Sequence, residues 1–177
     1  MTQTNALTLA IIKRDAIENG VAAKLLNHLN QNSFFSLNQP NYVELSPVVI
    51  GEFYVEHVGK SYFPNLMYSL SKCCPLLLVD STPDAQAAIP RLRNLVGPTA
   101  SREVPPDTLR GMFGGHIFNA DAPIAANAIH ASDSATSFVR EIKALKQFGL
   151  VFYDGAFVDV NCLAVAKDVP DDHWVEY

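Results

Sequence analysis

Hydrophobic residues fall into short unbroken runs and into helical stripes, and together they predict a chain of alternating strands and helices. Residues 7–12 form an apolar run that ends at charged residues, and residues 75–80 (PLLLVD) form a second one. Both runs indicate buried strands, and residues 34–45 predict another. Two β-prone runs within 150–160 surround an Asp-Gly pair, which is typical of a hairpin turn.

Apolar residues at helical spacing fill the intervals between these runs. The stripes are Val21, Leu25 and Leu29 after Gly20; Ile50, Tyr54 and Val58 from the cap at Ser46 and Pro47 to Gly59; Leu66 and Leu70 after Pro64; Ile89, Leu92 and Val96, with a kink expected at Pro90; and Phe138, Ile142 and Leu145 after Ser132, Asp133 and Ser134. Residues 97–126 have no clear periodicity, and so long a stretch in a compact domain usually serves function. The order of elements predicts an α+β domain with helices on one face of a mixed, mostly antiparallel sheet.

Composition narrows this picture to one domain. The chain has 177 residues and is 49% hydrophobic, so its core needs neither a disulfide nor a metal. The net charge of −5 does not suit a general duplex-DNA binder, but it allows a local basic pocket. Three cysteines, two of them adjacent, indicate reduced thiols and a cytoplasmic protein rather than a disulfide framework or a zinc site. Residues 1–12 place no basic residue before their apolar run, so we expect no signal peptide and no membrane span.

Among the five histidines, His130 has the most informative surroundings. It leaves an apolar segment directly into Ser-Asp-Ser, and a strand end that faces a helix N-terminus favours anions. An imidazole with an unperturbed pKa near ~6.5 is mostly neutral at neutral pH and can act as a nucleophile. His28 and His57 lie on polar flanks of the predicted helices, where a surface position is the simpler interpretation. The sequence has no HExxH or HxxxH pair, which argues against a zinc hydrolase.

Arginines crowd the middle of this acidic chain, at positions 91, 93, 102 and 110. Guanidinium groups bind phosphate oxygens in a bidentate manner, so the cluster suggests a phosphate site. The alternative is a solvated helix face and loop, which we favour for Arg91 and Arg102. The Walker, GxGxxG and protein-kinase motifs of common nucleotide-binding folds are absent from the sequence.

Residues 127–134 (NAIHASDS) resemble the Asn-x-x-His-x-Ser-Asp-Ser active-site signature of nucleoside diphosphate kinases. Residues 9–15 (LAIIKRD) resemble the first strand of that family with its phosphate-binding lysine. The other matching segments, in chain order, are residues 53–54, 62–66, 93–99, 108–111 and Glu141. The resemblance spans about residues 7–148.

This resemblance implies a ferredoxin-like sandwich, in which helices pack on a four-stranded, mostly antiparallel sheet, followed by a C-terminal hairpin. It also implies a kinase that moves the γ-phosphate of a nucleoside triphosphate to a nucleoside diphosphate by a ping-pong reaction, through a phosphohistidine on His130. The other implied site residues are Glu141, which orients the imidazole; Lys13, Tyr54 and Asn127 around the phosphoryl group and the sugar; Arg93, Thr99 and Arg110 on phosphates bridged by Mg²⁺; and Tyr62 and Leu66 on the two sides of the base. The implied partners are nucleoside tri- and diphosphates and further copies of the chain, as a tetramer or hexamer. We expect neither a membrane nor a nucleic acid as partner.

Simpler interpretations exist for several of these residues. Tyr54 and Leu66 also fit ordinary core positions, Lys13 fits the end of a strand, and Thr99 fits a loop. Glu141 also fits a solvated helix face. Ser132 fits a helix cap, and we favour this interpretation for it. The chain also departs from the family pattern at five positions. Arg14 replaces a usual proline, Tyr62 replaces a phenylalanine, and Ala131 replaces a common glycine. Ala100 and Ser101 replace the pair Asn-Pro.

We divide the single domain 1–177 into a kinase-like body at about 7–148, an inserted loop at about 114–123 and a C-terminal extension at 149–177. Two other hypotheses stand beside the kinase. The first is a catalytically weak homologue that acts as a regulatory or interaction module, and the intact set of site residues argues against it. The second is a nucleic-acid-binding ferredoxin-like domain, which the charge of −5 and the lack of an RNP-like aromatic strand disfavour.

Overall fold

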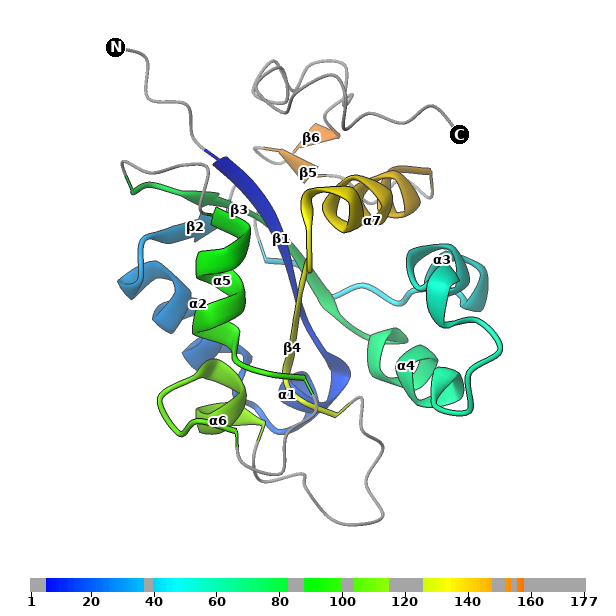
Figure 1. Cartoon of the computed structure of the whole chain (residues 1–177), viewed down its shortest axis with the longest axis horizontal. Helices are drawn as coiled ribbons and strands as arrows, with labels where there is room; N and C mark the ends of the chain where they lie inside the picture. Colours follow the sequence, from blue (N-terminus) through cyan, green and yellow to red (C-terminus); the bar gives the residue numbers. More distant parts are fainter. Residues whose placement is uncertain are drawn as a thin grey trace.

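Four antiparallel strands build the central sheet, in the order β2–β3–β1–β4 (Figure 1). The computed structural model describes residues 6–36, 40–82, 88–99, 104–114, 126–147, 152–153 and 156–157. The strands are β1 (Ala6–Ile12), β2 (Phe34–Ser36), β3 (Cys74–Asp80) and β4 (Ile129–Ala131). β1 lies between β3 and β4, and its Ile11 is opposite His130. The candidate histidine therefore lies on an edge strand, next to an interior one.

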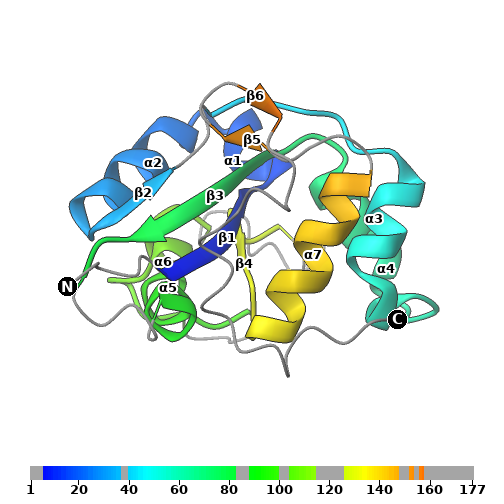
Figure 2. The ribbon, with the colours of Figure 1, turned by 90° about the horizontal axis from the view of Figure 1, so that it is seen from above.

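Helices cover both faces of this sheet (Figure 2). One face carries α2 (Ala22–Gln31), α5 (Ala88–Val96) and α6 (Leu109–Phe113), and the other carries α3 (Pro47–Phe53), α4 (Phe63–Leu70) and α7 (Ala135–Gln147). The short helix α1 (Arg14–Glu18) follows β1 directly, and a 3₁₀ turn, η1 (Val55–His57), follows α3.

The one-sided arrangement predicted from the order of elements is wrong, and so is the mixed sheet, because every ladder of this sheet is antiparallel. Leu9 and Ile11 of β1 pack into the core under α3, α4 and α7, whereas Ala10 and Ile12 pack into the core under α2 and α5. A strand that is apolar at successive positions is buried on both faces. The unbroken apolar runs of β1 and β3 are the sequence signal for this two-sided core.

Local signals determine where the helices begin. The Ser46 hydroxyl accepts the N–H of Val49 at 3.4 Å, and Pro47 is the first residue of α3, as predicted. Pro90 lies in the first turn of α5, where a missing N–H removes no helical hydrogen bond, so it does not interrupt the helix. Ser134 caps α7, because its Oγ accepts the N–H of Ser137 at 3.1 Å.

Three predicted elements differ from the structure in extent. Of the strand predicted at 34–45, β2 covers Phe34–Ser36 and residues 37–39 lie outside the described residues, whereas within 40–45 Val43 forms an isolated bridge to Cys73. The helix predicted at 46–59 stops at Phe53, and η1 follows it. The aperiodic stretch 97–126 contains α6, which the pattern did not predict.

The predicted C-terminal hairpin is present, since β5 (Phe152–Tyr153) pairs with β6 (Ala156–Phe157) in antiparallel fashion. Apart from Gly114, the predicted insertion lies outside the described residues, and so does most of the C-terminal extension. Cys73 and Cys74 are free and buried, and burial raises the pKa of their thiols to about 12 and about 11. In the described ranges no helix is long and apolar enough to span a bilayer.

Candidate active site

The alternation of side chains along β4 places His130 on the face of the sheet that α3 and α7 cover. The neighbouring side chains Ile129 and Ala131 join the core on the opposite face. The ring of His130 packs edge-on against Phe53 of α3, with 5.2 Å between ring centres. Only 8% of His130 is exposed, so its imidazole works in an environment with little water.

Both ring nitrogens of His130 have a polar partner. Nε2 lies 3.1 Å from Oε1 of the buried Glu141 in α7, and Nδ1 lies 3.3 Å from the hydroxyl of Tyr54. Ser132 donates its hydroxyl to the other carboxylate oxygen, Oε2, at 2.5 Å. Because an ionised carboxylate only accepts hydrogen bonds, this network assigns the proton to Nε2 and the lone pair to Nδ1.

Tyr54 completes this arrangement as a hydrogen-bond donor. Burial raises the pKa of its hydroxyl far above the usual value, and the negative charge of Glu141 raises it further. The hydroxyl therefore keeps its proton and donates it towards Nδ1. The sequence was compatible with Tyr54 as either a core residue or a site residue. The structure buries it to 5% exposure beside Phe53 and also directs its hydroxyl at His130.

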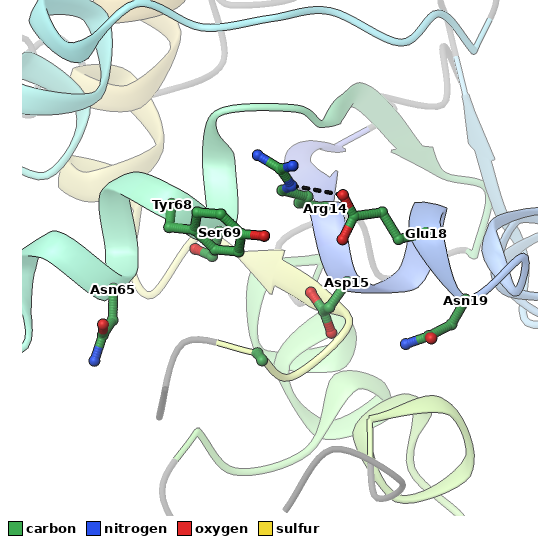
Figure 3. Close-up of a pocket in the computed structure, with 8 residues that line it drawn as sticks. Arg14, Asp15, Glu18, Asn19, Asn65, Tyr68 and Ser69 are labelled. Atoms are coloured by element: carbon green, nitrogen blue, oxygen red, sulfur yellow. Dashed lines mark hydrogen bonds and ion pairs between the residues drawn. The ribbon is translucent and has the colours of Figure 1, made fainter. Parts of the chain in front are cut away.

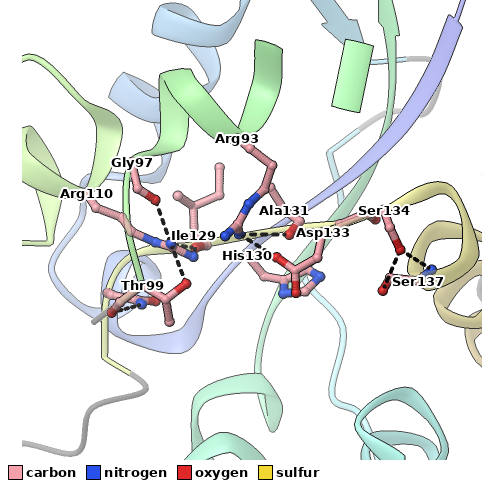
Figure 4. A network of polar contacts seen from close by, with 12 residues as sticks. Arg93, Gly97, Thr99, Arg110, Ile129, His130, Ala131, Asp133, Ser134 and Ser137 are labelled. Carbon is pink, nitrogen blue, oxygen red and sulfur yellow. Dashed lines mark hydrogen bonds and ion pairs between the residues drawn. The ribbon is translucent and has the colours of Figure 1, made fainter. Parts of the chain in front are cut away.

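Arg110, at the start of α6, binds the outward-facing backbone of β4 (Figure 4). Its Nε and Nη2 donate to the carbonyl of Ile129 at 3.2 and 2.9 Å, and its Nη1 donates to the Gly97 carbonyl at 2.8 Å and to Oγ1 of Thr99 at 2.9 Å. Burial and the nearby charge of Arg93 lower the pKa of Arg110 to about 10, so the guanidinium remains charged at neutral pH. Four of its five N–H groups are directed at protein oxygens, which makes Arg110 a firmly held positive charge.

Arg93, near the end of α5, binds the same edge of β4 on the other side of His130 along the strand. Its Nη1 donates to the carbonyl of Ala131 at 3.4 Å and pairs with Asp133 at 3.0 Å. The two arginines therefore bind the carbonyls of the residues immediately before and after His130, and Figure 4 shows them along one edge of β4. This edge concentrates positive charge although the chain as a whole carries −5.

Lys13 brings a third cation to the end of β1. It is 3% exposed, and its Nζ donates to Oδ1 of Asn127 at 2.8 Å. The amide of Asn127 donates to the carbonyl of Thr99 at 3.4 Å, so this side chain links the lysine to the loop that holds Arg110. Burial, helped by the charge of Arg110, lowers the pKa of Lys13 to about 7, while Asp15 opposes this shift.

Tyr62 and Leu66 lie one helical turn apart at the start of α4, and the N–H of Leu66 donates to the carbonyl of Tyr62 at 3.2 Å. Residues spaced in this way share one side of a helix, so they form one wall rather than the two sides of a sandwich. Leu66 is half-buried against the core, whereas Tyr62 is 37% exposed. The Tyr62 hydroxyl lies 3.1 Å from Nδ1 of His57, so the histidine that the pattern placed at the surface contacts this residue of the wall.

A separate cavity of about 210 Å³ lies between α1 and α4 (Figure 3). It is lined by Arg14, Asp15, Glu18, Asn19, Asn65, Tyr68, Ser69 and Ala126, none of which the sequence placed in the site. Arg14, which replaces a usual proline, pairs with Glu18 at 2.7 Å, donates to the hydroxyl of Ser71 at 3.1 Å and covers the ring of Tyr68. This arginine thus connects α1 to α4.

The structure brings the predicted residues into two neighbouring hydrogen-bonded groups. Tyr54, His130 and Glu141 form one, and Lys13, Asn127, Thr99 and Arg110 form the other, which touches β4 through the bonds of Arg110 to the Ile129 carbonyl. Ser132, which the sequence assigned elsewhere, joins the first group. Ser132 is fully buried and bonded to Glu141, so the prediction of a helix cap was wrong for it. Arg91 lies outside the network, as predicted, but it is paired with the buried Asp80 rather than solvated. Arg102 lies outside the described residues.

The groups available to a phosphate here are mainly the cations Lys13, Arg93 and Arg110, and the nearest exposed carboxylate, Asp133, is paired with Arg93. In the part of the chain that the structure describes, no three His, Cys, Asp or Glu side chains converge as a metal site.

Comparison with known proteins agrees with this geometry. A family model described as nucleoside diphosphate kinase matches residues 6–147. The chain is 34% identical over 138 residues to a nucleoside diphosphate kinase of Aquifex aeolicus, and the alignment covers 76% of this chain and 89% of that protein. It is also 34% identical over 139 residues to nucleoside diphosphate kinase homolog 5 of Danio rerio, covering 77% of this chain and 58% of that protein.

Solved structures agree as well. A crystal structure of the Aquifex aeolicus nucleoside diphosphate kinase superposes with a TM-score of 0.67 at 30% identity, over 87% of this chain and 99% of that one. The Halobacterium salinarum enzyme in complex with CDP superposes with a TM-score of 0.68 at 22% identity, over 88% and 92% of the two chains, and shows the same fold.

Proposed function

The chain belongs to the nucleoside diphosphate kinase family, and from that membership we propose that it is an active enzyme that moves the terminal phosphoryl group of a nucleoside triphosphate to a nucleoside diphosphate. The observation that carries the proposal is the pair of contacts on His130. Glu141 accepts a hydrogen bond from Nε2, and the lone pair of Nδ1, to which among the described residues only the Tyr54 hydroxyl donates at 3.3 Å, lies in a buried pocket near Lys13, Arg93 and Arg110.

In the first half of the proposed reaction, Nδ1 of His130 attacks the γ-phosphorus of the triphosphate. The new N–P bond forms as the bond to the bridging oxygen breaks, and the diphosphate leaves with that oxygen. In the second half, a terminal oxygen of another diphosphate attacks the phosphohistidine and the N–P bond breaks, so the enzyme is regenerated in a ping-pong cycle. Glu141 stabilises the positive charge that the ring gains during the attack.

Lys13, Arg93 and Arg110 supply the charge that the phosphates need, and Thr99 and Asn127 supply polar contacts beside them. Phosphoryl transfer depends mainly on positioning and on electrostatic stabilisation, which a fixed group of cations provides. Mg²⁺ bound to the phosphate oxygens would neutralise further charge. The protonated Tyr54 donates to Nδ1 in the resting enzyme, and we infer that it transfers this hydrogen bond to a phosphate oxygen when the nucleotide binds.

The base would stack on the wall formed by Tyr62 and Leu66. Stacking on an aromatic face does not depend on the hydrogen-bonding edge of the base, so we expect activity on all common bases. The assignments of Lys13, Asn127 and Tyr62 to phosphate, sugar and base follow from the resemblance and are part of this proposal.

The competing hypothesis is a homologue with weak turnover that acts as an interaction module, and the Danio rerio relative named as a homolog gives it some weight. The experiment is to incubate the protein with γ-labelled ATP and Mg²⁺ and then to add GDP. We expect an acid-labile, alkali-stable phosphoenzyme that GDP discharges, and no label on His130→Ala. His28→Ala, which changes a histidine outside the pocket, should label normally. An unlabelled wild-type protein would refute the enzyme.

We further infer that the enzyme is a cytoplasmic homo-oligomer, a tetramer or hexamer. Phe35 is 48% exposed on the edge strand β2, and an open edge with an exposed aromatic side chain favours association with a second copy. Sedimentation equilibrium of the full chain measures the number of subunits, and a monomer at micromolar concentration would contradict the inference.

A further inference from the structure

The backbone between two site residues, Asn127 and His130, makes an unusual turn. Ala128 has φ of +66°, and the N–H of Ile129 donates to the carbonyl of Asn127 at 2.8 Å. A three-residue turn with an i to i+2 hydrogen bond and a central residue at positive φ is a strained γ-turn, rare for any residue other than glycine. Such strain persists only where the surroundings hold it in place.

The junction of β1 and α1 provides that hold. The carboxylate oxygen Oδ2 of Asp15 accepts the N–H of Ala128 at 2.8 Å, and the backbone N–H of Lys13 donates to the carbonyl of Ala128 at 2.9 Å. Both backbone polar groups of the strained residue are therefore bound by residues two positions apart in the chain. Ala128 itself is completely buried, so water offers neither group an alternative.

The position of the carboxylate is costly, which indicates that its contact with the turn is important. The second oxygen of Asp15, Oδ1, is buried and makes no well-formed hydrogen bond among the residues that the structure describes. Burial raises the pKa of this carboxyl, while the N–H of Ala128, the charge of Lys13 and the nearby backbone N–H groups of Asp15 and Ala16 lower it. A buried acceptor with one oxygen unsatisfied destabilises a fold unless its other contacts compensate.

We infer that Asp15 is a positioning residue for phosphoryl transfer. It holds the strained turn at Ala128, and the geometry of that turn sets the positions of Asn127 and His130. Asn127 then reaches Nζ of Lys13 at 2.8 Å, and His130 stays in register with Ile11. This inference rests on the proposed function. It assigns a role to a residue that makes no contact with the imidazole.

Two other roles would also make Asp15 important, and they predict different variants to fail. If Asp15 acts by its charge on Lys13, then Asp15→Asn, which keeps an acceptor oxygen but loses the charge, should be as poor as Asp15→Ala. If Asp15 only stabilises the fold, then Asp15→Ala should lose the same factor in labelling rate whether or not the strain of the turn has been removed. Ala128→Gly removes that strain, because glycine adopts positive φ without a steric penalty.

The experiment measures single-turnover labelling of the full chain from γ-labelled ATP and Mg²⁺ at several pH values around the Lys13 pKa of about 7, so that a rate loss caused by Lys13 losing its proton shows as a pH dependence. We expect Asp15→Ala to lower the rate roughly 10- to 100-fold, as a misplaced reacting group does. Asp15→Asn should stay within about 5-fold of the wild type, and Asp15→Ala in the Ala128→Gly background should lose less than about 5-fold relative to Ala128→Gly alone. Glu18→Ala, which removes the next carboxylate of α1, is the matched control and should label normally.

Hydrogen exchange of the Ala128 amide, followed by NMR without nucleotide, gives an independent measurement. Asp15→Ala should accelerate this exchange at least about tenfold, because the amide loses its acceptor. If the wild type takes no label, the proposed function fails, and the exchange rate alone then decides whether Asp15 holds the turn. An unchanged labelling rate or unchanged exchange in Asp15→Ala, an equal loss in both backgrounds, or a loss beyond about 5-fold in Asp15→Asn would overturn the inference. Should Asp15→Ala not fold, the Asp15→Asn limit decides the question.

Discussion

Lys13 holds an ammonium group where almost no solvent reaches it, and this position links its function to the stability of the fold. Burial lowers the pKa of the group from 10.5 to about 7 in the folded protein. A buried charge that a ligand will later neutralise destabilises the free protein, and active sites commonly retain such groups.

The lowered pKa gives an expected pH dependence of stability. Between pH 7 and pH 10.5 the unfolded chain keeps a proton on Lys13 that the folded chain has lost, so the free energy of unfolding should increase with pH. One such proton contributes at most ~1.4 kcal/mol per pH unit. We expect Lys13→Met to lack this increase, as measured by urea unfolding of both proteins at several pH values in the window. Other titrating groups are common to both proteins and cancel in the difference, so equal slopes would show that Lys13 titrates normally.

The two serines of the Ser-Asp-Ser segment should respond differently to the same substitution. Ser132→Ala removes the hydrogen bond to Oε2 of Glu141, so the carboxylate holds His130 less firmly, and we expect the labelling rate to fall by roughly 10-fold. Ser134→Ala removes the cap of α7, which should lower the free energy of unfolding by about 1 kcal/mol and leave the rate nearly unchanged. Single-turnover labelling and urea unfolding of both variants separate the two roles. A larger rate loss in Ser134→Ala would show that the assignment is reversed.

At the scale of single elements, the short helix α6 depends on close contacts between backbone segments. A Cβ at Gly111 would lie 2.0 Å from the carbonyl oxygen of Pro105, and the cap Thr108 lies directly against Gly97. Arg110 belongs to this helix, so its position along β4 depends on how closely these segments approach.

Two helical glycines should therefore differ in their response to alanine. We expect Gly111→Ala to destabilise the protein by about 1–3 kcal/mol or more, because the carbonyl of Pro105 is backbone and cannot rotate away as a side chain would. Gly51→Ala in α3, with no heavy atom within 4 Å of the new Cβ, should instead stabilise it by about 0.5–1 kcal/mol through the higher helix propensity of alanine. Urea unfolding of both variants tests the contrast, and a similar change in the two would contradict it.

Helix length largely decided which elements the sequence could predict. α7 has 13 residues, enough for the stripe of Phe138, Ile142 and Leu145 to establish a helical period after a serine cap. α1 and α6 have five residues each, little more than one turn, so no period could emerge from the pattern. The local cap at Ser46 and Pro47 was predictable, but the end of that helix was not, because tertiary contacts decide where a short helix stops.

The same distinction applies to the site. The motif around His130 predicted the residues that the structure brings together, whereas Ser132 was misassigned because either serine of Ser-Asp-Ser satisfies the pattern of a cap. Asp15 closes the matching segment 9–15, but nothing in the sequence indicated its role. Its partner is a backbone N–H 113 residues away, and the need for an acceptor there arises only from the φ of Ala128.

For the whole molecule, the two-sided core explains how an acidic chain supports a basic site. Apolar residues on both faces of β1 occupy the core, and Lys13 follows directly at the end of this strand. There it lies near the edge of β4 whose carbonyls the arginines bind. Three acidic side chains also lie at the site, where Asp133 pairs with Arg93, Glu141 contacts His130 and Asp15 acts on Lys13. The local field therefore depends on how these cations and carboxylates are arranged and not on the net charge.

Ligand binding should accordingly stabilise the molecule through phosphate rather than through the nucleoside. Burial and the charge of Arg110 lower the pKa of Lys13, and burial and the charge of Arg93 lower the pKa of Arg110, so the free protein holds these cations at a cost. At about 100 times its Kd, ADP with Mg²⁺ should add about 2.7 kcal/mol of stability, which corresponds to a rise in Tm of roughly 5–10 °C for a domain of this size. Adenosine at the same concentration lacks the phosphates and should raise Tm by no more than about 1–2 °C, and Lys13→Met should reduce the ADP effect. Thermal unfolding of the full chain measures all three. Equal stabilisation by adenosine and ADP would mean that the cations do not bind the phosphates.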